Sequence, residues 1–492
     1  MPGVRTFVWL HAADAGRPRL YVGVCAMLGH KTLICRVAAL LLIASLTFTS
    51  VGCMSLVERL VPQREPAPTS EPPLSDPGTT PVVARPTSRP VPRAARPTGI
   101  ISTQAAETVA SEVIDSSGGT ITVVRPGDPV HGLVLEVPAG SYPDARKFTI
   151  SSAPVLDHTF GDTFNPLSPL ITIENGGNYS DEFMTVTVPI DLPDDWFAMP
   201  FYFDEATGTL EGIPFNSLTD DSITVVTRHF SSFTISGILN SQLDGLIEQG
   251  IDSGFRPGVD DWQFTNYGSY ISDGGHCAGQ VLTALWYYCE QPDGEDPFLW
   301  GLYDNNRREP PTPDLWEDDS HGYRLASTIQ EDIDWGDYQN RLMESLAGVS
   351  DELAFKAFAY GMHRTGEPQE VGIFASAGGG HDMVTYRVDR NGLAIADPNF
   401  PGDTQLRIEY SNGAFEPYTS GASATEIEAG NVLVFETIQY CAKSATIDWG
   451  QIGARWQEFR AGTIGNDRFP AYEAVVVHDD DTEEPLVDGY ES

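Results

Sequence analysis

The chain has 492 residues, of which 69 are acidic and 29 are basic, so its formal net charge at pH 7 is -40. A surface with this charge repels phosphate backbones, and we therefore expect no nucleic-acid partner. The length exceeds what one ordinary hydrophobic core can organise, which predicts two folded domains together with non-globular segments.

The first 53 residues have the order of an export signal. Lys31 and Arg36 precede an apolar run from Val37 to Phe48, and small residues then lead to Cys53. The run is shorter than the roughly 20 residues that a membrane-spanning helix needs. This order resembles a bacterial lipoprotein signal, and the resemblance implies that Cys53 is lipidated and anchors the protein at the cell envelope, outside the cytoplasm. Ordinary secretion and an uncleaved signal anchor are the alternatives.

Residues 54–107 form a predicted linker. Proline, serine, threonine and arginine dominate its central part, and no apolar periodicity is present. Such a composition cannot build a core. We therefore expect a disordered, extended tether between the anchor and the folded domains.

Residues 108–240 are predicted to form a β-sandwich, because short alternating segments are separated by Gly, Pro, Asp and Asn at intervals of about ten residues. The segments are "TITVV", "GLVLEVP", "KFTISSA", "LITIEN", "MTVTVPI", "SITVVT" and "FTISGI".

Within this region "SSGGTITVV", "GLVLEVPAGSY", "VTVPIDLPDD" and "RHFSSFTIS" resemble the ZU-type β-sandwich. Some members of that family cleave their own chain between the Phe and the Ser of a His-Phe-Ser triplet. His229, Phe230 and Ser231 form this triplet here, so the resemblance implies self-cleavage as one role for it. An ordinary strand start is the alternative.

Residues 250–475 are predicted to form an α+β domain. From Cys277 to Gln291 the apolar residues recur with the period of a helix. A second helix is expected from Asp351 to His363, with Ser350 as its N-cap. Three strands are then expected within "EVGIFASA", "GGGHDMVTYRV" and "LAIADPNFPG", the last two joined by a turn at "DRNG". Residues 476–492 are acidic and are predicted to form a disordered tail.

Cys277 has the surroundings of a nucleophile, since it follows two glycines at the expected start of a helix. A thiol attacks as its thiolate, which the positive end of a helix stabilises. Gly274 and Gly275 have no side chains and would let a substrate backbone approach. His381, which follows three glycines, is the best candidate for the base, and Asp397 on the next strand is the candidate that orients its ring.

The segments "GGHCAG", "GGGHDMVTYRV" and "LAIADPN" together resemble papain-like cysteine peptidases, in particular the bacterial branch that includes bacteriocin-processing peptidase domains. The resemblance covers roughly Phe255 to Thr437. It implies Cys277 as nucleophile, His381 as general base and acid, and Asp397 as the orienting group, with Asn399 as the second choice for that role.

The chain departs from the papain-like pattern where an oxyanion glutamine is expected. Six residues before Cys277 stands Ile271. The nearest upstream amides are Gln263 and Asn266, and Asn266 is the preferred candidate. Loss of such a donor lowers the rate by about 10² to 10³.

Three cysteines follow Cys53. Cys277 and Cys289 lie on one expected helix, roughly 18 Å apart, which is too far for a disulfide. Cys289 with Cys441 is the disulfide that leaves Cys277 free, and two buried free thiols are the alternative.

The acidic clusters do not match a calcium loop, and no zinc motif occurs, so we expect no metal and no cofactor. The expected reaction is hydrolysis of a peptide or other amide bond in a polypeptide substrate, through a thioester on Cys277. Two alternatives remain: a non-catalytic module for surface binding or adhesion, and transglutaminase-like acyl transfer to an amine.

Overall fold

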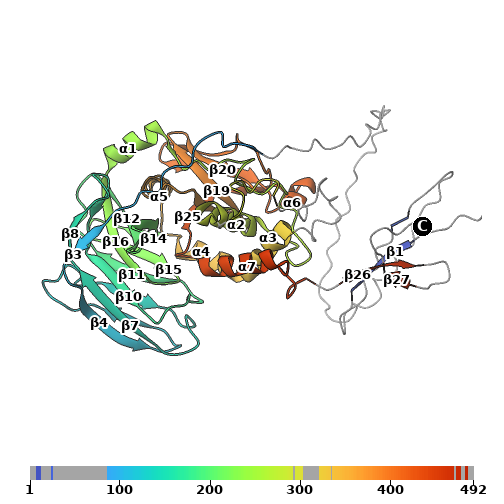
Figure 1. Cartoon of the computed structure of the whole chain (residues 1–492). Helices are drawn as coiled ribbons and strands as arrows, with labels where there is room; N and C mark the ends of the chain where they lie inside the picture. Colours follow the sequence, from blue (N-terminus) through green and yellow to red (C-terminus); the bar gives the residue numbers. More distant parts are fainter. Residues whose placement is uncertain are drawn as a thin grey trace, which may run out of the picture. The chain divides into compact units, whose positions relative to one another are not determined.

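The computed structural model describes residues 86–291, 294–302, 321–333 and 335–469, together with four strands near the chain ends (Figure 1). The chain divides into two units, Ala84–Phe469 and a second unit made of Met1–Val83 with Pro470–Ser492. In the described part, no helix is both long enough and apolar enough to cross a membrane.

The second unit contains one four-stranded sheet, in the order β2-β1-β26-β27. Its strands are β1 (Phe7–Ala12), β2 (Val24–Cys25), β26 (Tyr472–Val477) and β27 (Glu483–Pro485). Two of these strands fall within the predicted signal, and β27 lies in the tail that we predicted to be disordered. Cys53 and the predicted linker up to residue 85 lie outside the described residues.

The larger unit is mostly β-sheet, and its first part holds two large antiparallel sheets besides a two-stranded sheet of β3 and β8. One has the order β13-β12-β16-β10-β7-β4 with β9 beside β16, and the other has the order β14-β15-β11-β6-β5. The bounds are β3 (Ile101–Thr103), β4 (Glu107–Ile114), β5 (Gly119–Thr122), β6 (Val134–Val137), β7 (Arg146–Ala153), β8 (Val155–His158), β9 (Asn165–Pro166), β10 (Leu170–Glu174), β11 (Met184–Pro189), β12 (Trp196–Asp204), β13 (Thr209–Gly212), β14 (Phe215–Leu218), β15 (Ser222–Thr227) and β16 (Ser232–Leu239).

Alternation places one side of each sheet in a common core. In β11, for example, Met184, Val186 and Val188 are buried and the residues between them are half-buried. All seven segments that we predicted as strands contain a strand.

Strand β12 was not predicted, because it is buried along almost its whole length and shows no alternation. Its outer side is covered by α5 (Asp351–Thr365), where Tyr360 packs edge-on against Phe201 at 5.2 Å between ring centroids. One hydrophobic core therefore extends from the two sheets into the region that we predicted as a separate domain from residue 250. The two predicted domains form one compact unit.

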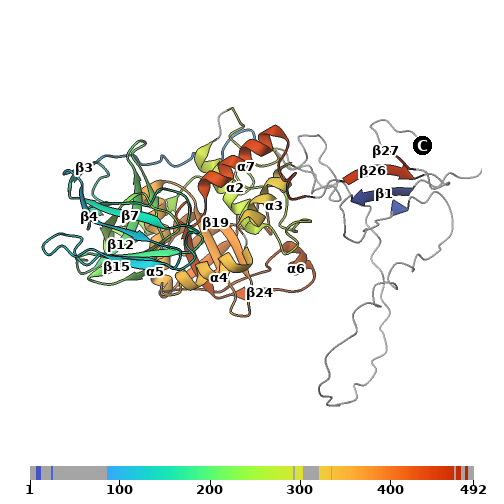
Figure 2. The ribbon, with the colours of Figure 1, turned by 90° about the horizontal axis from the view of Figure 1, so that it is seen from below.

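The rest of this unit is built on a central sheet in the order β22-β21-β20-β19-β18-β25, with β17 beside β19. Helices α2, α3 and α7 lie on one face and α5 lies on the other, as the two views show (Figures 1 and 2). The bounds are α1 (Asn240–Gln249), β17 (Ile251–Asp252), α2 (Cys277–Glu290), α3 (His321–Asp332), α4 (Trp335–Ser345), β18 (Gln369–Phe374), β19 (Gly380–Asp389), β20 (Gly392–Ala396), β21 (Arg407–Ser411), β22 (Ala414–Phe415), β23 (Tyr418–Ser420), α6 (Ala424–Glu428), β24 (Leu433–Phe435), β25 (Thr437–Ala442) and α7 (Trp449–Ala461).

The helices and strands that the sequence predicts around the candidate site are confirmed. Helix α2 begins at Cys277, and α5 begins after Ser350, whose Oγ accepts a hydrogen bond from the backbone N–H of Leu353 at 3.4 Å. Strands β18, β19 and β20 lie within the three expected segments and pair in antiparallel order.

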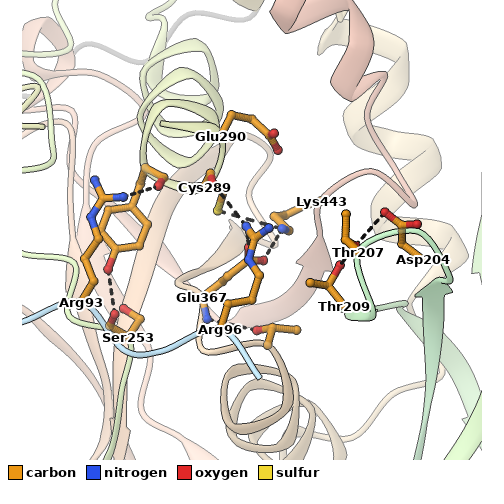
Figure 3. A network of polar contacts seen from close by, with 12 residues as sticks. Arg93, Arg96, Asp204, Thr207, Thr209, Ser253, Cys289, Glu290, Glu367 and Lys443 are labelled. Atoms are coloured by element: carbon orange, nitrogen blue, oxygen red, sulfur yellow. Dashed lines mark hydrogen bonds and ion pairs between the residues drawn. The ribbon is translucent and has the colours of Figure 1, made fainter. Parts of the chain in front are cut away.

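The linker prediction is wrong for residues 86–107. Figure 3 shows Arg93 and Arg96 of this segment lying against the end of α2. Arg93 donates to the carbonyl of Tyr288 at 2.8 Å, and Arg96 forms an ion pair with the buried carboxylate of Glu367, which also pairs with Lys443. A buried carboxylate needs such cations, so the arginines of a proline-rich stretch fix it in place.

The three described cysteines are free thiols. Cys289 and Cys441 are both buried, and Cys441 packs beside Gly372 of β18 rather than pairing with Cys289. The structure thus has the buried free thiols that we held as the alternative to a disulfide.

Candidate active site

Cys277 is the first residue of α2, and its side chain is partly exposed. The preceding residue, His276, occupies the N-cap without a side-chain hydrogen bond to the helix. Gly275 adopts a positive φ of 120°, and a Cβ there would lie 3.1 Å from Oδ1 of Asn266, so the turn into the helix requires glycine. The thiol therefore stands at the positive end of the helix dipole.

His276 is not a base in this site. Its ring is buried and meets Tyr323 edge-on at 4.5 Å between centroids. Burial lowers the pKa of His276 to about 3, so the ring is neutral at physiological pH.

His381 and Asp397 form a buried pair. Strands β19 and β20 are paired with Val384 opposite Ala396, which brings Asp397, the next residue along, beside the start of β19. Nε2 of His381 donates to Oδ1 of Asp397 at 2.7 Å, and both side chains have no exposed surface. The sequence could not determine this register. The structure brings together His381 and Asp397, the two residues that the sequence predicted to interact.

The charged form of His381 is favoured. Burial opposes the charge on the ring, but the Asp397 carboxylate outweighs it and the Cys277 thiol adds to the effect, so the pKa of His381 is raised well above its usual range. The second ring nitrogen, Nδ1, is buried and has no hydrogen-bond partner of normal geometry among the described residues. It is the nitrogen left for a proton from the neighbouring thiol.

The remaining oxygen of Asp397 is also held. Its Oδ2 accepts from the hydroxyl of Tyr418 at 2.9 Å, and Oδ1 accepts from the backbone N–H of Asn399 at 2.8 Å. Such bonds fix the direction of the carboxylate. Tyr418 begins the short strand β23 and carries no sequence signal for this role, because no motif links it to His381 or Asp397.

Asn399 and Asn266 use their amide groups to join the segment before α2 to the segment after β20, instead of acting on substrate. Nδ2 of Asn266 donates to Oδ1 of Asn399 and to the carbonyl of Ala422, each at 3.0 Å, while its Oδ1 accepts from the N–H of His276 at 2.6 Å. Asn399 in turn donates to the carbonyl of Gly421 at 2.8 Å and lies 3.4 Å from the ring of His381.

Asn266 therefore has no amide hydrogen left for an oxyanion, contrary to our expectation. Asn399 is not the group that orients His381, since Asp397 is closer and charged. Gln263 is half-buried and does not line the pocket beside Cys277.

A pocket of about 350 Å³ joins the thiol and the imidazole, within the range of ligand-binding pockets. Gln330 of α3 contributes the one side-chain amide among the described residues of its lining. Oε1 of Gln330 accepts from the backbone N–H of Gly279 at 3.0 Å, which fixes the amide group beside the start of α2. Sequence reasoning missed Gln330, because it follows Cys277 instead of preceding it.

The His229-Phe230-Ser231 triplet lies between β15 and β16, at some distance along the chain from this pocket. The ring of His229 is within 3.2 Å of Ser444 Oγ, and burial lowers its pKa. Ser231 is exposed. The ring is thus engaged by Ser444, which does not favour a role in activating Ser231.

No protein-family model and no curated protein sequence matches the chain. No group of three or more His, Cys, Asp or Glu side chains suited to hold a metal ion occurs in the part of the chain that the structure describes. Function must therefore be argued from the chemistry of the pocket itself.

Proposed function

We propose that this chain is a cysteine-dependent amide hydrolase of the papain-like type, with Cys277 as nucleophile, His381 as general base and acid, and Asp397 as the orienting group. One observation carries the proposal. A single pocket contains a partly exposed thiol at a helix N-terminus and an imidazole whose other nitrogen is held at 2.7 Å by a buried carboxylate.

In the proposed reaction the thiol proton passes to Nδ1 of His381, and the thiolate attacks the carbonyl carbon of the substrate. The C–N bond then breaks, and the leaving amine takes the proton from the imidazolium, which leaves a thioester on Cys277. A water molecule next gives a proton to Nδ1 and its hydroxide attacks the thioester. The carboxylic acid departs, and the proton returns to the thiol.

The amide of Gln330 and the backbone N–H of Cys277 are the proposed oxyanion donors. Support comes from the place of Gln330 in the pocket lining and from the bond that fixes its Oε1, which leaves the NH₂ end of the amide as a donor. A donor from α3 takes the place of the upstream amide that the papain-like pattern would have.

Selective alkylation tests the thiolate. A low dose of iodoacetamide at pH 6 should label Cys277 much faster in the wild type than in His381→Ala, because only the thiolate reacts and the imidazole is the group that takes its proton. Cys289 and Cys441 serve as internal controls, since burial raises the pKa of both thiols. Equal, slow labelling of Cys277 in the two proteins would contradict the proposal.

Digestion of a broad peptide library tests the reaction itself, with wild type and Cys277→Ala compared. New peptide ends that appear only with the wild type support hydrolysis. Fast labelling without cleavage, followed by covalent product when a tagged amine is supplied, would instead show acyl transfer. The absence of both would favour a non-catalytic surface module.

The wider architecture is also part of the proposal: an exported, lipid-anchored protein in which a ZU-like sandwich precedes the papain-like region. The order of the N-terminal signal and the two antiparallel sheets support it. If Cys53 is the lipidated residue, Cys53→Ala should move the protein from the membrane fraction to the soluble fraction of the exporting cell.

A further inference from the structure

A second pair of ionisable side chains lies in the same pocket and has no part in the proposed chemistry. Glu370 of β18 and Asp382 of β19 are both buried, with 1% and 3% of their surface exposed. In the antiparallel register Asp382 is opposite Gly372, two residues from Glu370, so the two carboxylates are diagonal neighbours on one face of the sheet.

Position 372 requires glycine, because a Cβ there would lie 2.9 Å from Sγ of Cys441, which packs on the same face. The two acids and this thiol line the same pocket as Cys277.

One side-chain hydrogen bond of these acids joins the two carboxyl groups to each other. Apart from that bond, Oε2 of Glu370 and both carboxylate oxygens of Asp382 are buried without a side-chain partner of normal geometry among the described residues. Such groups are rare in folded proteins and costly when they remain ionised. Burial, followed by the charge of Asp382, raises the pKa of Glu370 well above its usual range, so the two carboxyl groups share a proton.

The wider pocket is negative as well. Asp273 and Glu331 also line it, and no lysine or arginine occurs among the described residues of its lining. A low-dielectric cleft lined by one sign of charge concentrates ligands of the opposite sign.

We propose that Glu370 and Asp382 form the specificity subsite of the proposed hydrolase and that this subsite receives a basic side chain, preferably arginine, of the polypeptide substrate. The inference rests on the proposed function only where it concerns cleavage of the substrate; binding of the cation does not depend on that function. The planar guanidinium has five N–H donors in a fixed fork, enough to satisfy all three unpartnered oxygens at once. Lysine, which has three donors on a single nitrogen, is expected to bind less well.

A metal ion is a poorer occupant. The described residues include no cluster of three or more metal-binding side chains, and calcium takes six to eight oxygen ligands. An organic cation needs only the two carboxylates, and its stem can lie along Phe374, which also lines the pocket.

The substrate test uses two fluorogenic peptides that differ in one residue, arginine or its neutral isostere citrulline. Because the neutral isostere leaves the two buried carboxylates without a cation, the wild type should have a kcat/KM at least about 30-fold higher for the arginine peptide. The double variant Glu370→Gln, Asp382→Asn should lose this preference. Asp273→Asn is the matched control, since it removes one exposed negative charge from the same lining and should keep the preference. Equal kcat/KM values for the two peptides with the wild type would overturn the inference.

The binding test does not need catalysis. N-acetyl-arginine amide and N-acetyl-citrulline amide are titrated calorimetrically into the full chain carrying Cys277→Ala, with and without the two carboxylate substitutions. Binding of the arginine compound alone, lost in the substituted chain, supports the subsite even if no peptide is cleaved, which would be a failure of the proposed function only. Absence of arginine binding, or equal binding of both compounds, overturns the subsite whatever the result of the peptide digestion.

A second readout is the proton count. The entering guanidinium displaces the proton that the pair shares, so proton release near pH 6.5 is expected when the titration is repeated in buffers of different ionisation enthalpy. The other ionisable groups that line the pocket of the Cys277→Ala chain are His381 on β19, Cys441 on β25, Glu331 on α3 and the exposed Asp273. Release that persists in Glu370→Gln would assign it to one of these groups and contradict the inference.

Discussion

Two consecutive residues of β19, His381 and Asp382, are equally buried but have opposite electrostatic surroundings. His381 meets an acid, Asp397, whose oxygens are all engaged by donors. Asp382 meets another acid, Glu370, and three of the four oxygens in that pair have no donor apart from the proton that the two acids share. The first pair is complete by itself, whereas the second is complete only with a proton or a cation added.

Glu367 can be compared directly with Glu370, because it lies three residues earlier in the chain and is also buried. There the chain supplies two cations, Arg96 and Lys443, as Figure 3 shows. The protein thus neutralises a structural carboxylate with its own side chains. It provides no lysine or arginine for the two carboxylates beside the thiol among the described residues of the pocket lining, which is the difference expected between a structural site and a binding site.

Asp397→Asn removes the charge from the His381–Asp397 pair and should have the largest effect on kcat. The amide cannot stabilise an imidazolium, so we expect kcat of the proposed hydrolysis to fall by about 10⁴-fold, as for the equivalent change in a serine-protease triad. The rate of Cys277 alkylation at pH 6 should fall with it, measured by mass spectrometry of the labelled peptide. Tyr418→Phe is the matched control, since it removes only one bond to Asp397 and keeps the charge; if it matched the loss in Asp397→Asn, the argument from charge would be wrong.

Gln330→Ala removes the proposed oxyanion donor and should have the next largest effect. The expected loss in kcat is about 10² to 10³, with little change in KM, because the bond forms mainly in the transition state. Gln330→Glu keeps an oxygen to accept from Gly279 but has no NH₂ group. It should lose as much activity as the alanine variant; wild-type kcat in this variant would assign Gln330 to structure alone.

Much of the secondary structure around the site was predictable, because strong local signals set it. The helix period after Cys277 and the serine before Asp351 gave α2 and α5 within a few residues. Strand β12 was missed because α5 covers its second face, and that burial is a tertiary effect without a local pattern. The arginines at positions 93 and 96 were assigned to a linker because their partners lie about 190 and 270 residues further along the chain.

The residues of the site likewise fall into those that the sequence could predict and those that it could not. Cys277 lies two residues after Gly275, His381 follows Gly380 and Asp397 precedes Pro398, each near the end of an element, so their order in the sequence was sufficient to predict them. Gln330 and the Glu370–Asp382 pair stand inside a helix and two strands. Their roles depend on sheet register and on the packing of α3, which the sequence pattern does not determine.

Glu370→Gln should have the smallest effect, and it tests the Glu370–Asp382 pair through the free energy of unfolding. In the folded state the pKa of Glu370 is raised, whereas in the unfolded chain it returns to its usual value near 4.3. As pH rises above that value the unfolded chain loses its proton while the folded chain keeps it, so the folded state becomes relatively less stable. Glutamine removes this dependence and supplies a donor to Asp382. We therefore expect the free energy of unfolding to rise by roughly 1–3 kcal/mol at pH 8 and by less at pH 5, measured by denaturant unfolding.

Glu436→Gln is the control, since Glu436 is exposed and its pKa is lowered by hydrogen bonds from Ser376, so its removal should not stabilise the protein. A loss of stability in Glu370→Gln at pH 8 would mean that the pair is already satisfied, and the contrast between the two residues of β19 would fail.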